Sequence, residues 1–134
     1  MIEIHLDIIG VILIALALAH AIFPSYFHWK IELPKLSLIN QEMMKVHTFF
    51  IALTVLLMGV LCLSSSTELV QTSLGKNVSL GFGIFWGFRL VTQFFGYSSL
   101  LWKGKKFETL VHIVFTILWI YFTFVFFLIY YTAN

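Results

Sequence analysis

Three histidines occupy matching positions in three apolar stretches of the chain. His20 lies near the end of the first stretch, whereas His47 and His112 lie near the beginnings of the second and fourth. If successive stretches are helices of alternating direction, all three lie about 9–12 Å from the helix midpoints, on one side, at 1.5 Å per residue. Neutral imidazole is the commonest protein ligand for transition metals, and two imidazoles can hold a haem iron. The trio therefore predicts a haem or transition-metal site, with interhelical hydrogen bonding as the alternative role.

Arg89 is a charged residue within the third apolar stretch, and the sequence places no carboxylate at its depth. Asp7 is expected near the outer face, and Glu42 and Glu108 near the cytoplasmic end. A guanidinium stays protonated, so Arg89 needs a partner such as a haem propionate, a lipid phosphate or a quinone carbonyl. The alternative is that Arg89 snorkels and is capped by Gln93, one turn away. Arg89 and Gln93 are thus candidate cofactor-binding residues, and the cation favours an anionic cofactor over a bare divalent metal.

Polar residues follow helical spacing on the stretches that carry these candidates. Arg89 and Gln93 share one face of the third stretch, and Gly10 shares a face with His20 on the first. A small residue such as Gly10 allows close helix approach. The fourth stretch has one continuous polar stripe, which is expected to face inward because lipid does not solvate it: Glu108, His112, Thr116, Trp119, Thr123 and Tyr130.

A membrane has to position these residues, because the composition excludes an ordinary soluble domain. Of the 134 residues, 60% are hydrophobic and 10% charged, against about 25% charged in soluble domains. A spanning helix needs about 20 apolar residues, and the sequence offers four such stretches, near 5–23, 43–64, 78–101 and 108–131. The acidic first residues favour a retained helix over a cleaved signal peptide. These features predict an all-α fold, an up-down four-helix transmembrane bundle that forms a single domain over 1–134.

The distribution of lysine predicts the orientation. The connection 24–41, with the start of the second stretch, and the connection 102–107 together carry six lysines: Lys30, Lys35, Lys45, Lys103, Lys105 and Lys106. The positive-inside rule therefore places 24–41 and 102–107 in the cytoplasm and both termini on the outer side. Pro24 is expected to end the first helix. The segment 24–41 mixes aromatic and charged residues, which is typical of a segment lying in the membrane interface.

Two parts of the chain carry a resemblance to other sequences. They are AHAIFPSYFHWK followed by LSLINQEMMKVHTFF, within residues 19–50, and FWGFRLVTQFFGY over residues 85–97. In these motifs the chain resembles a group of small, uncharacterised bacterial four-helix integral membrane proteins. The resemblance spans most of the chain. It implies the fold and a multi-pass position in a bacterial inner (plasma) membrane, and it carries no activity with it.

Three hypotheses for the function follow. The first is a membrane protein that binds haem or a transition metal through His20, His47 and His112 near the cytoplasmic side, with Arg89 as the anion partner. The second is a non-catalytic structural or assembly subunit, partnered by other membrane subunits or a second copy. The third is a small transporter or enzyme acting on a lipid or quinone. The bilayer is the expected environment, and the absence of a basic, base-stacking patch argues against nucleic acid. Whether the protein is an enzyme is left open.

Overall fold

The computed structural model describes residues 1–132, and these form helices and turns without a strand. Four helices are long and apolar enough to cross a membrane: α1 (Ile2–Ala19), α4 (Leu38–Ser64), α6 (Ser73–Phe95) and α7 (Lys106–Thr132). This confirms the all-α class and four membrane-length helices, as in a multi-pass integral membrane protein. The up-down arrangement and the sides of the termini stay predictions.

Large apolar side chains are exposed on all four long helices. Examples are Leu18 on α1, Phe50 on α4, Phe88 on α6 and Phe124 on α7, each more than half exposed. Soluble monomers rarely expose apolar surface on this scale, whereas lipid solvates it at no cost. The exposed surface is therefore consistent with contact with acyl chains.

Contacts between residues divide the chain into two compact units. The first, Ile4–Ser66, is called the α1–α4 hairpin. The second runs from Thr67 onward and clusters with Met1–Glu3; it is called the α6–α7 hairpin and contains most of the short helix α5 (Ser66–Gln71). A single domain over 1–134 stays a prediction.

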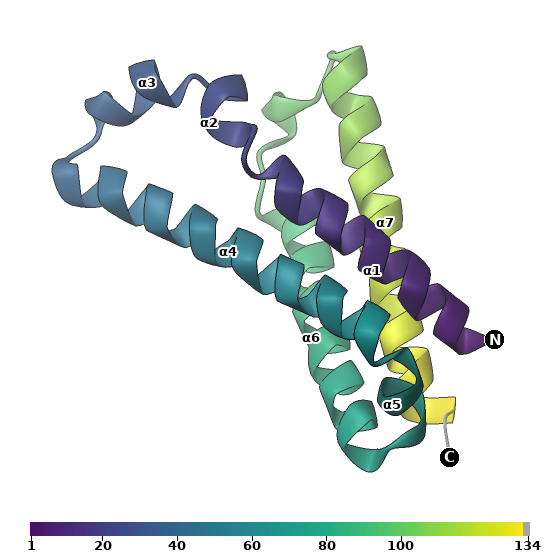
Figure 1. Cartoon of the computed structure of the whole chain (residues 1–134). Helices are drawn as coiled ribbons and strands as arrows, with labels where there is room; N and C mark the ends of the chain where they lie inside the picture. Colours follow the sequence, from purple (N-terminus) through teal and green to yellow (C-terminus); the bar gives the residue numbers. More distant parts are fainter. Residues whose placement is uncertain (133–134) are drawn as a thin grey trace. The chain divides into compact units, whose positions relative to one another are not determined.

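The α1–α4 hairpin is closed at one end by two glycines. A Cβ atom on Gly10 would lie 2.9 Å from the Gly59 carbonyl oxygen, and one on Gly59 would lie 2.9 Å from the Gly10 carbonyl oxygen. The two backbones can approach this closely only because neither residue has a side chain. The predicted close approach at Gly10 is confirmed. Towards the other end α1 and α4 diverge, and a segment of short helices connects them (Figure 1).

The connecting segment comprises α2 (Phe23–Tyr26), α3 (Trp29–Glu32) and the 3-10 helix η1 (Leu33–Lys35). The sequence predicted a first helix to residue 23 that Pro24 would end. Instead α1 ends at Ala19, and Pro24 lies in the first turn of α2, where a missing N–H costs nothing. His28, between α2 and α3, has φ 55° and ψ 47°, in the left-handed region. This turns the chain sharply between the two short helices.

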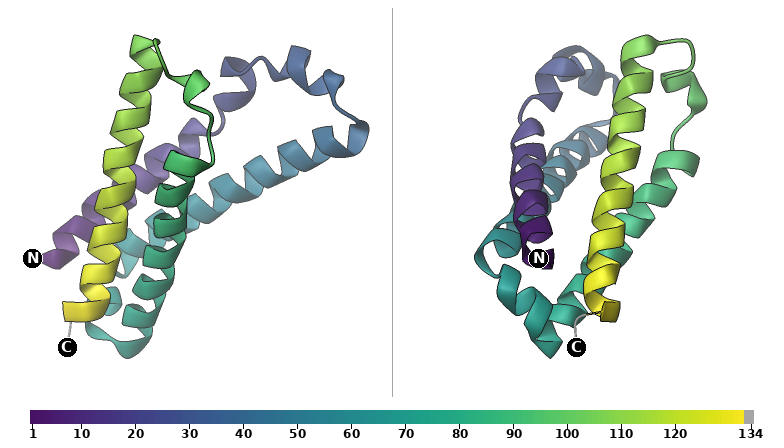
Figure 2. Two further views of the ribbon diagram at one scale, coloured as in Figure 1. Left: turned by 180° about the vertical axis from the view of Figure 1, so that it is seen from behind. Right: turned by 90° about the vertical axis from the view of Figure 1, so that its right-hand side faces the viewer.

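The α6–α7 hairpin consists of two antiparallel helices in contact along their length (Figure 2). Aromatic pairs fill the contact: Phe82 and Phe126 meet edge to face at 5.4 Å, and Trp86 stacks on Trp119 at 5.0 Å. The connection contains the 3-10 helix η2 (Ser99–Leu101) and turns at Gly104, whose φ of +76° favours glycine.

Helices α4 and α6 begin before the predicted spans because hydropathy reports the apolar part of a helix and not its polar first turns. Helix α4 begins at residue 38, not 43, with Ser37 in extended conformation before it. Helix α6 begins at residue 73, not 78, because the Thr72 hydroxyl accepts a hydrogen bond from the Gly75 N–H and caps the helix. It ends at Phe95, not at residue 101.

Candidate functional site

Gln93 is the centre of a polar network between α6 and α7. Its Oε1 accepts hydrogen bonds from Arg89 Nη1 (3.2 Å) and from Trp119 Nε1 (3.3 Å). Its Nε2 donates to His112 Nδ1 (2.9 Å) and to the His112 carbonyl oxygen (3.4 Å). Gln93 is 5% exposed, and every one of its hydrogen-bonding groups is used. Three of the candidates identified from the sequence are therefore brought together.

The donors in this network determine where the His112 proton lies. Arginine and tryptophan side chains only donate, so the Gln93 atom that faces them must be the carbonyl oxygen. The amide NH₂ group therefore faces His112, and Nδ1 of that imidazole must accept. A neutral His112 then carries its proton on Nε2. In this arrangement Nε2 is a hydrogen-bond donor and not a free lone pair.

Arg89 is surrounded by polar and aromatic groups from its own hairpin. Its Nη2 donates to the Tyr97 hydroxyl at 3.4 Å, and its Cζ lies 5.1 Å from the Trp119 ring centroid and 5.5 Å from that of Tyr97. No ion pair involving Arg89 occurs within residues 1–132. The capping of Arg89 by Gln93 is thus observed. An external anion as its partner stays a prediction.

Aromatic rings hold the two ends of this network. The Trp102 ring stacks on the His112 imidazole at 3.9 Å with 12° between the planes. At the other end Trp119 lies between Trp86 and Phe115, stacked on both. Trp102 was not a candidate from the sequence, because nothing in the spacing links it to His112. The inward direction of the polar stripe is confirmed at His112 and Trp119, which contact α6.

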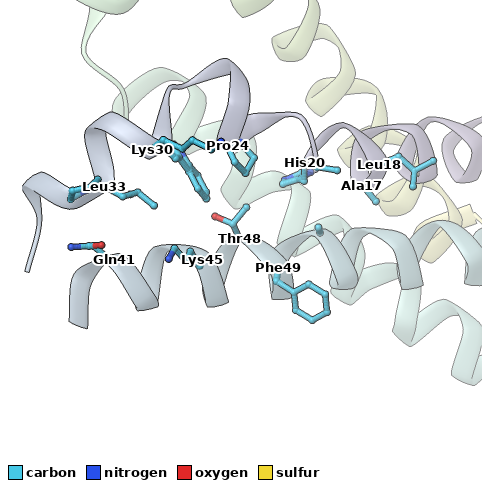
Figure 3. Close-up of a pocket in the computed structure, with 14 residues that line it drawn as sticks. Ala17, Leu18, His20, Pro24, Lys30, Leu33, Gln41, Lys45, Thr48 and Phe49 are labelled. Atoms are coloured by element: carbon cyan, nitrogen blue, oxygen red, sulfur yellow. The ribbon is translucent and has the colours of Figure 1, made fainter. Parts of the chain in front are cut away.

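A pocket of about 630 Å³ lies in the α1–α4 hairpin, where the helices diverge. Figure 3 shows side chains from α1, the connecting segment and α4 around it, with Thr48 pointing from α4 towards the connecting segment. Its lining is Ala17, Leu18, His20, Ala21, Pro24, Trp29, Lys30, Leu33, Pro34, Gln41, Lys45, Thr48, Phe49 and Ala52.

The pocket has a basic and polar end and an apolar end. Lys30, Gln41, Lys45 and Thr48 supply hydrogen-bond donors, and none of the lining residues is a carboxylate. Lys45 forms an ion pair with Glu42, which lies one turn earlier in α4. The distance is 3.7 Å, and both side chains are more than half exposed. The net charge of the lining is therefore positive.

His20 and His47 form the same kind of hydrogen bond within their helices, but only His20 faces the pocket. His20 Nδ1 donates to the Leu16 carbonyl oxygen at 2.7 Å, and His47 Nδ1 donates to that of Met43 at 2.9 Å. Because carbonyl oxygens only accept, each imidazole carries its proton on Nδ1. His20 lines the pocket and His47 does not. At about 100° per residue, His47 faces away from the side of α4 that carries the pocket residues.

The predicted histidine trio is divided between the two hairpins. His20 and His47 belong to one and His112 to the other. Within the part of the chain that the structure describes, no group of three or more histidine, cysteine, aspartate or glutamate side chains is arranged to hold a metal. The haem or transition-metal site therefore stays a prediction.

The pocket residues Trp29, Lys30 and Thr48 were not candidates from the sequence. The mixed aromatic and charged composition of segment 24–41 was a signal for an interfacial position. It carried no signal that the segment folds over α4.

Comparisons with protein-family models, with characterised proteins and with solved structures found no match to the chain. The resemblance to small bacterial four-helix membrane proteins therefore stays a prediction. The geometry of the two hairpins is the basis for the function proposed below.

Proposed function

We propose that this protein is an integral membrane protein that binds an acidic amphiphile of the bilayer in the pocket of the α1–α4 hairpin. The observation that carries the proposal is the lining of this pocket. It joins an apolar wall to two lysines and includes no carboxylate. This is the lipid-interacting form of the third hypothesis from the sequence.

The apolar part of the pocket suits an acyl chain. Its volume of about 630 Å³ lies within the range of roughly 300–1,000 Å³ that is usual for small-molecule sites. The wall at this end consists of aliphatic and aromatic side chains: Ala17, Leu18, Ala21, Phe49 and Ala52. Hydrocarbon fills such a space without the loss of hydrogen bonds that water would suffer there.

The polar part suits the charged end of the same molecule. Lys30 belongs to the connecting segment, which the positive-inside rule predicts at the cytoplasmic interface, where lipid headgroups lie. Lysines at that level are attracted to acidic lipids. Along the lining, Ala17 and Leu18 lie at the α1 end and Lys30 lies in the connecting segment, which matches the order of acyl chain and headgroup in a lipid.

The proposal is tested by filling the apolar end. The protein is purified in detergent and bound lipid is counted by native mass spectrometry. We expect a retained lipid in the wild type and its loss in Ala52→Trp, because the indole takes the space of the acyl chain. Phe50→Trp is the matched control, since Phe50 is 55% exposed and does not line the pocket. Equal retention in the two variants would contradict the proposal.

A further inference from the structure

We infer that the pocket selects phospholipids of net negative charge, with Lys30 as the ligand of the phosphate. This inference rests on the proposed function and adds the class of headgroup to it. Three observations support it: a second hollow adjoins the pocket, the other two lysines of this hairpin form ion pairs with glutamates, and neither hollow is lined by a carboxylate.

A second hollow of about 490 Å³ adjoins the pocket. Trp29 and Lys30 line both spaces, so they form a common wall. The second hollow adds Ser25 and His28 to the polar groups within reach. The left-handed conformation of His28 turns the chain so that residues before and after it line one space.

Lys30 is the lysine of the α1–α4 hairpin whose charge is available. Lys35 pairs with Glu32 at 3.1 Å and Lys45 pairs with Glu42 at 3.7 Å. Lys30 has no ion pair within residues 1–132. Because Lys30 lines both hollows, we expect its ammonium to bind an anion that enters either of them. Phosphate oxygens form strong, charge-assisted hydrogen bonds with lysine.

The sign of the lining distinguishes acidic from zwitterionic lipids. Neither hollow is lined by aspartate or glutamate. The ammonium of a choline or ethanolamine headgroup would find no carboxylate there and would lie near Lys30, where like charges repel. A headgroup of neutral hydroxyls would instead meet Ser25 and His28, which can exchange hydrogen bonds with it. Phosphatidylglycerol has this chemistry.

The two spaces favour a phospholipid over a fatty acid. A fatty acid ends at its carboxylate, which would reach Lys30 and leave the smaller hollow unused. A phospholipid continues beyond the phosphate, so its headgroup can occupy that hollow while the acyl chain lies in the pocket. Trp29 suits this boundary, because indole rings prefer the level of the headgroups.

The experiment measures lipid binding to delipidated full-length protein in detergent, by native mass spectrometry. Phosphatidylglycerol, phosphatidylcholine, palmitate and inorganic phosphate are titrated separately. Both lipids carry the phosphate, but only phosphatidylcholine places a second cation near Lys30, so we expect phosphatidylglycerol to bind about tenfold more tightly. Lys30→Gln should abolish this preference and Lys30→Arg should retain it. Lys35→Gln, which removes an exposed lysine outside both hollows, should leave it unchanged.

The possible results test separately the charge of the headgroup, the assignment to a phospholipid and the role of Lys30. Equal binding of phosphatidylglycerol and phosphatidylcholine to the wild type would overturn the inference and the acidic character of the ligand, whereas lipid retention that Ala52→Trp abolishes would still support an amphiphile in the pocket. Palmitate or inorganic phosphate binding as tightly as phosphatidylglycerol would overturn the assignment to a phospholipid. A preference that persists in Lys30→Gln would overturn the role of Lys30. No binding of any lipid would overturn both the inference and the proposed function.

Discussion

The two hairpins use polar residues in opposite ways. In the α6–α7 hairpin, Gln93 binds to Arg89, Trp119 and His112 with every donor and acceptor it has. In the α1–α4 hairpin, Lys30 and Thr48 are among the residues that line a pocket of about 630 Å³. The first arrangement is closed and the second is open.

This difference separates two roles for polar residues in lipid. A buried polar group is expensive without a partner, so a group that is fully bonded within its own hairpin is explained by the fold. A lysine without an ion pair beside a hollow has no such explanation. At the level of the lipid headgroups such a lysine is attracted to acidic lipids, so it points to a molecule from outside the chain. We therefore assign a structural role to the network and a binding role to the pocket.

The largest expected effect comes from breaking the closed network. Gln93→Leu removes the acceptor of Arg89 and Trp119 and the donor to His112. We expect it to lower the free energy of unfolding by about 2–3 kcal/mol, because buried donors are left unsatisfied. Unfolding in detergent with increasing dodecyl sulfate, followed by circular dichroism, measures this loss. Lipid retention by the folded fraction should not change.

The matched control lies next to Gln93 on the same helix. Thr92 is exposed, and its hydroxyl donates to the Phe88 carbonyl oxygen of its own helix. Thr92→Val should therefore change the free energy of unfolding by less than about 0.5 kcal/mol. A similar loss in Gln93→Leu and Thr92→Val would show that the network contributes nothing beyond helix formation.

A smaller effect, on proton position alone, distinguishes the hairpins residue by residue. The hydrogen bonds of His20 and His47 to carbonyl oxygens require Nδ1–H, whereas the bond from Gln93 requires Nε2–H at His112. Nitrogen NMR of histidine-labelled protein in detergent, at a pH where the imidazoles are neutral, should resolve the two tautomers. Gln93→Leu should shift His112 alone. Finding the same tautomer at all three residues would remove the basis for the closed network.

The sequence predicted the helices and part of the network, for physical reasons that act locally. Twenty apolar residues in a row can only span a membrane as a helix, and i, i+4 spacing alone brings Arg89 to Gln93. The inward direction of the polar stripe on α7 followed from the same spacing. Contacts within one helix, or on one of its faces, need no knowledge of the fold.

The pocket could not be predicted, because it depends on how a short segment folds back. The prediction that Pro24 would end the first helix was wrong: α1 ends at Ala19 and Pro24 lies in the first turn of α2. The left-handed conformation of His28 leaves no mark in hydropathy. Lys30 was read only as part of a charge asymmetry, although its position beside two hollows gives it a ligand-binding role in our account.

The most direct test of the difference between the hairpins is to find where an acidic lipid binds. Phosphatidylglycerol with a photoreactive acyl chain is added to delipidated protein in detergent at one molar equivalent, irradiated, and the labelled peptides are identified. The account predicts labels within residues 17–52 that unlabelled phosphatidylglycerol displaces and that Ala52→Trp abolishes. Displaceable labels confined to residues 73–132 would contradict it.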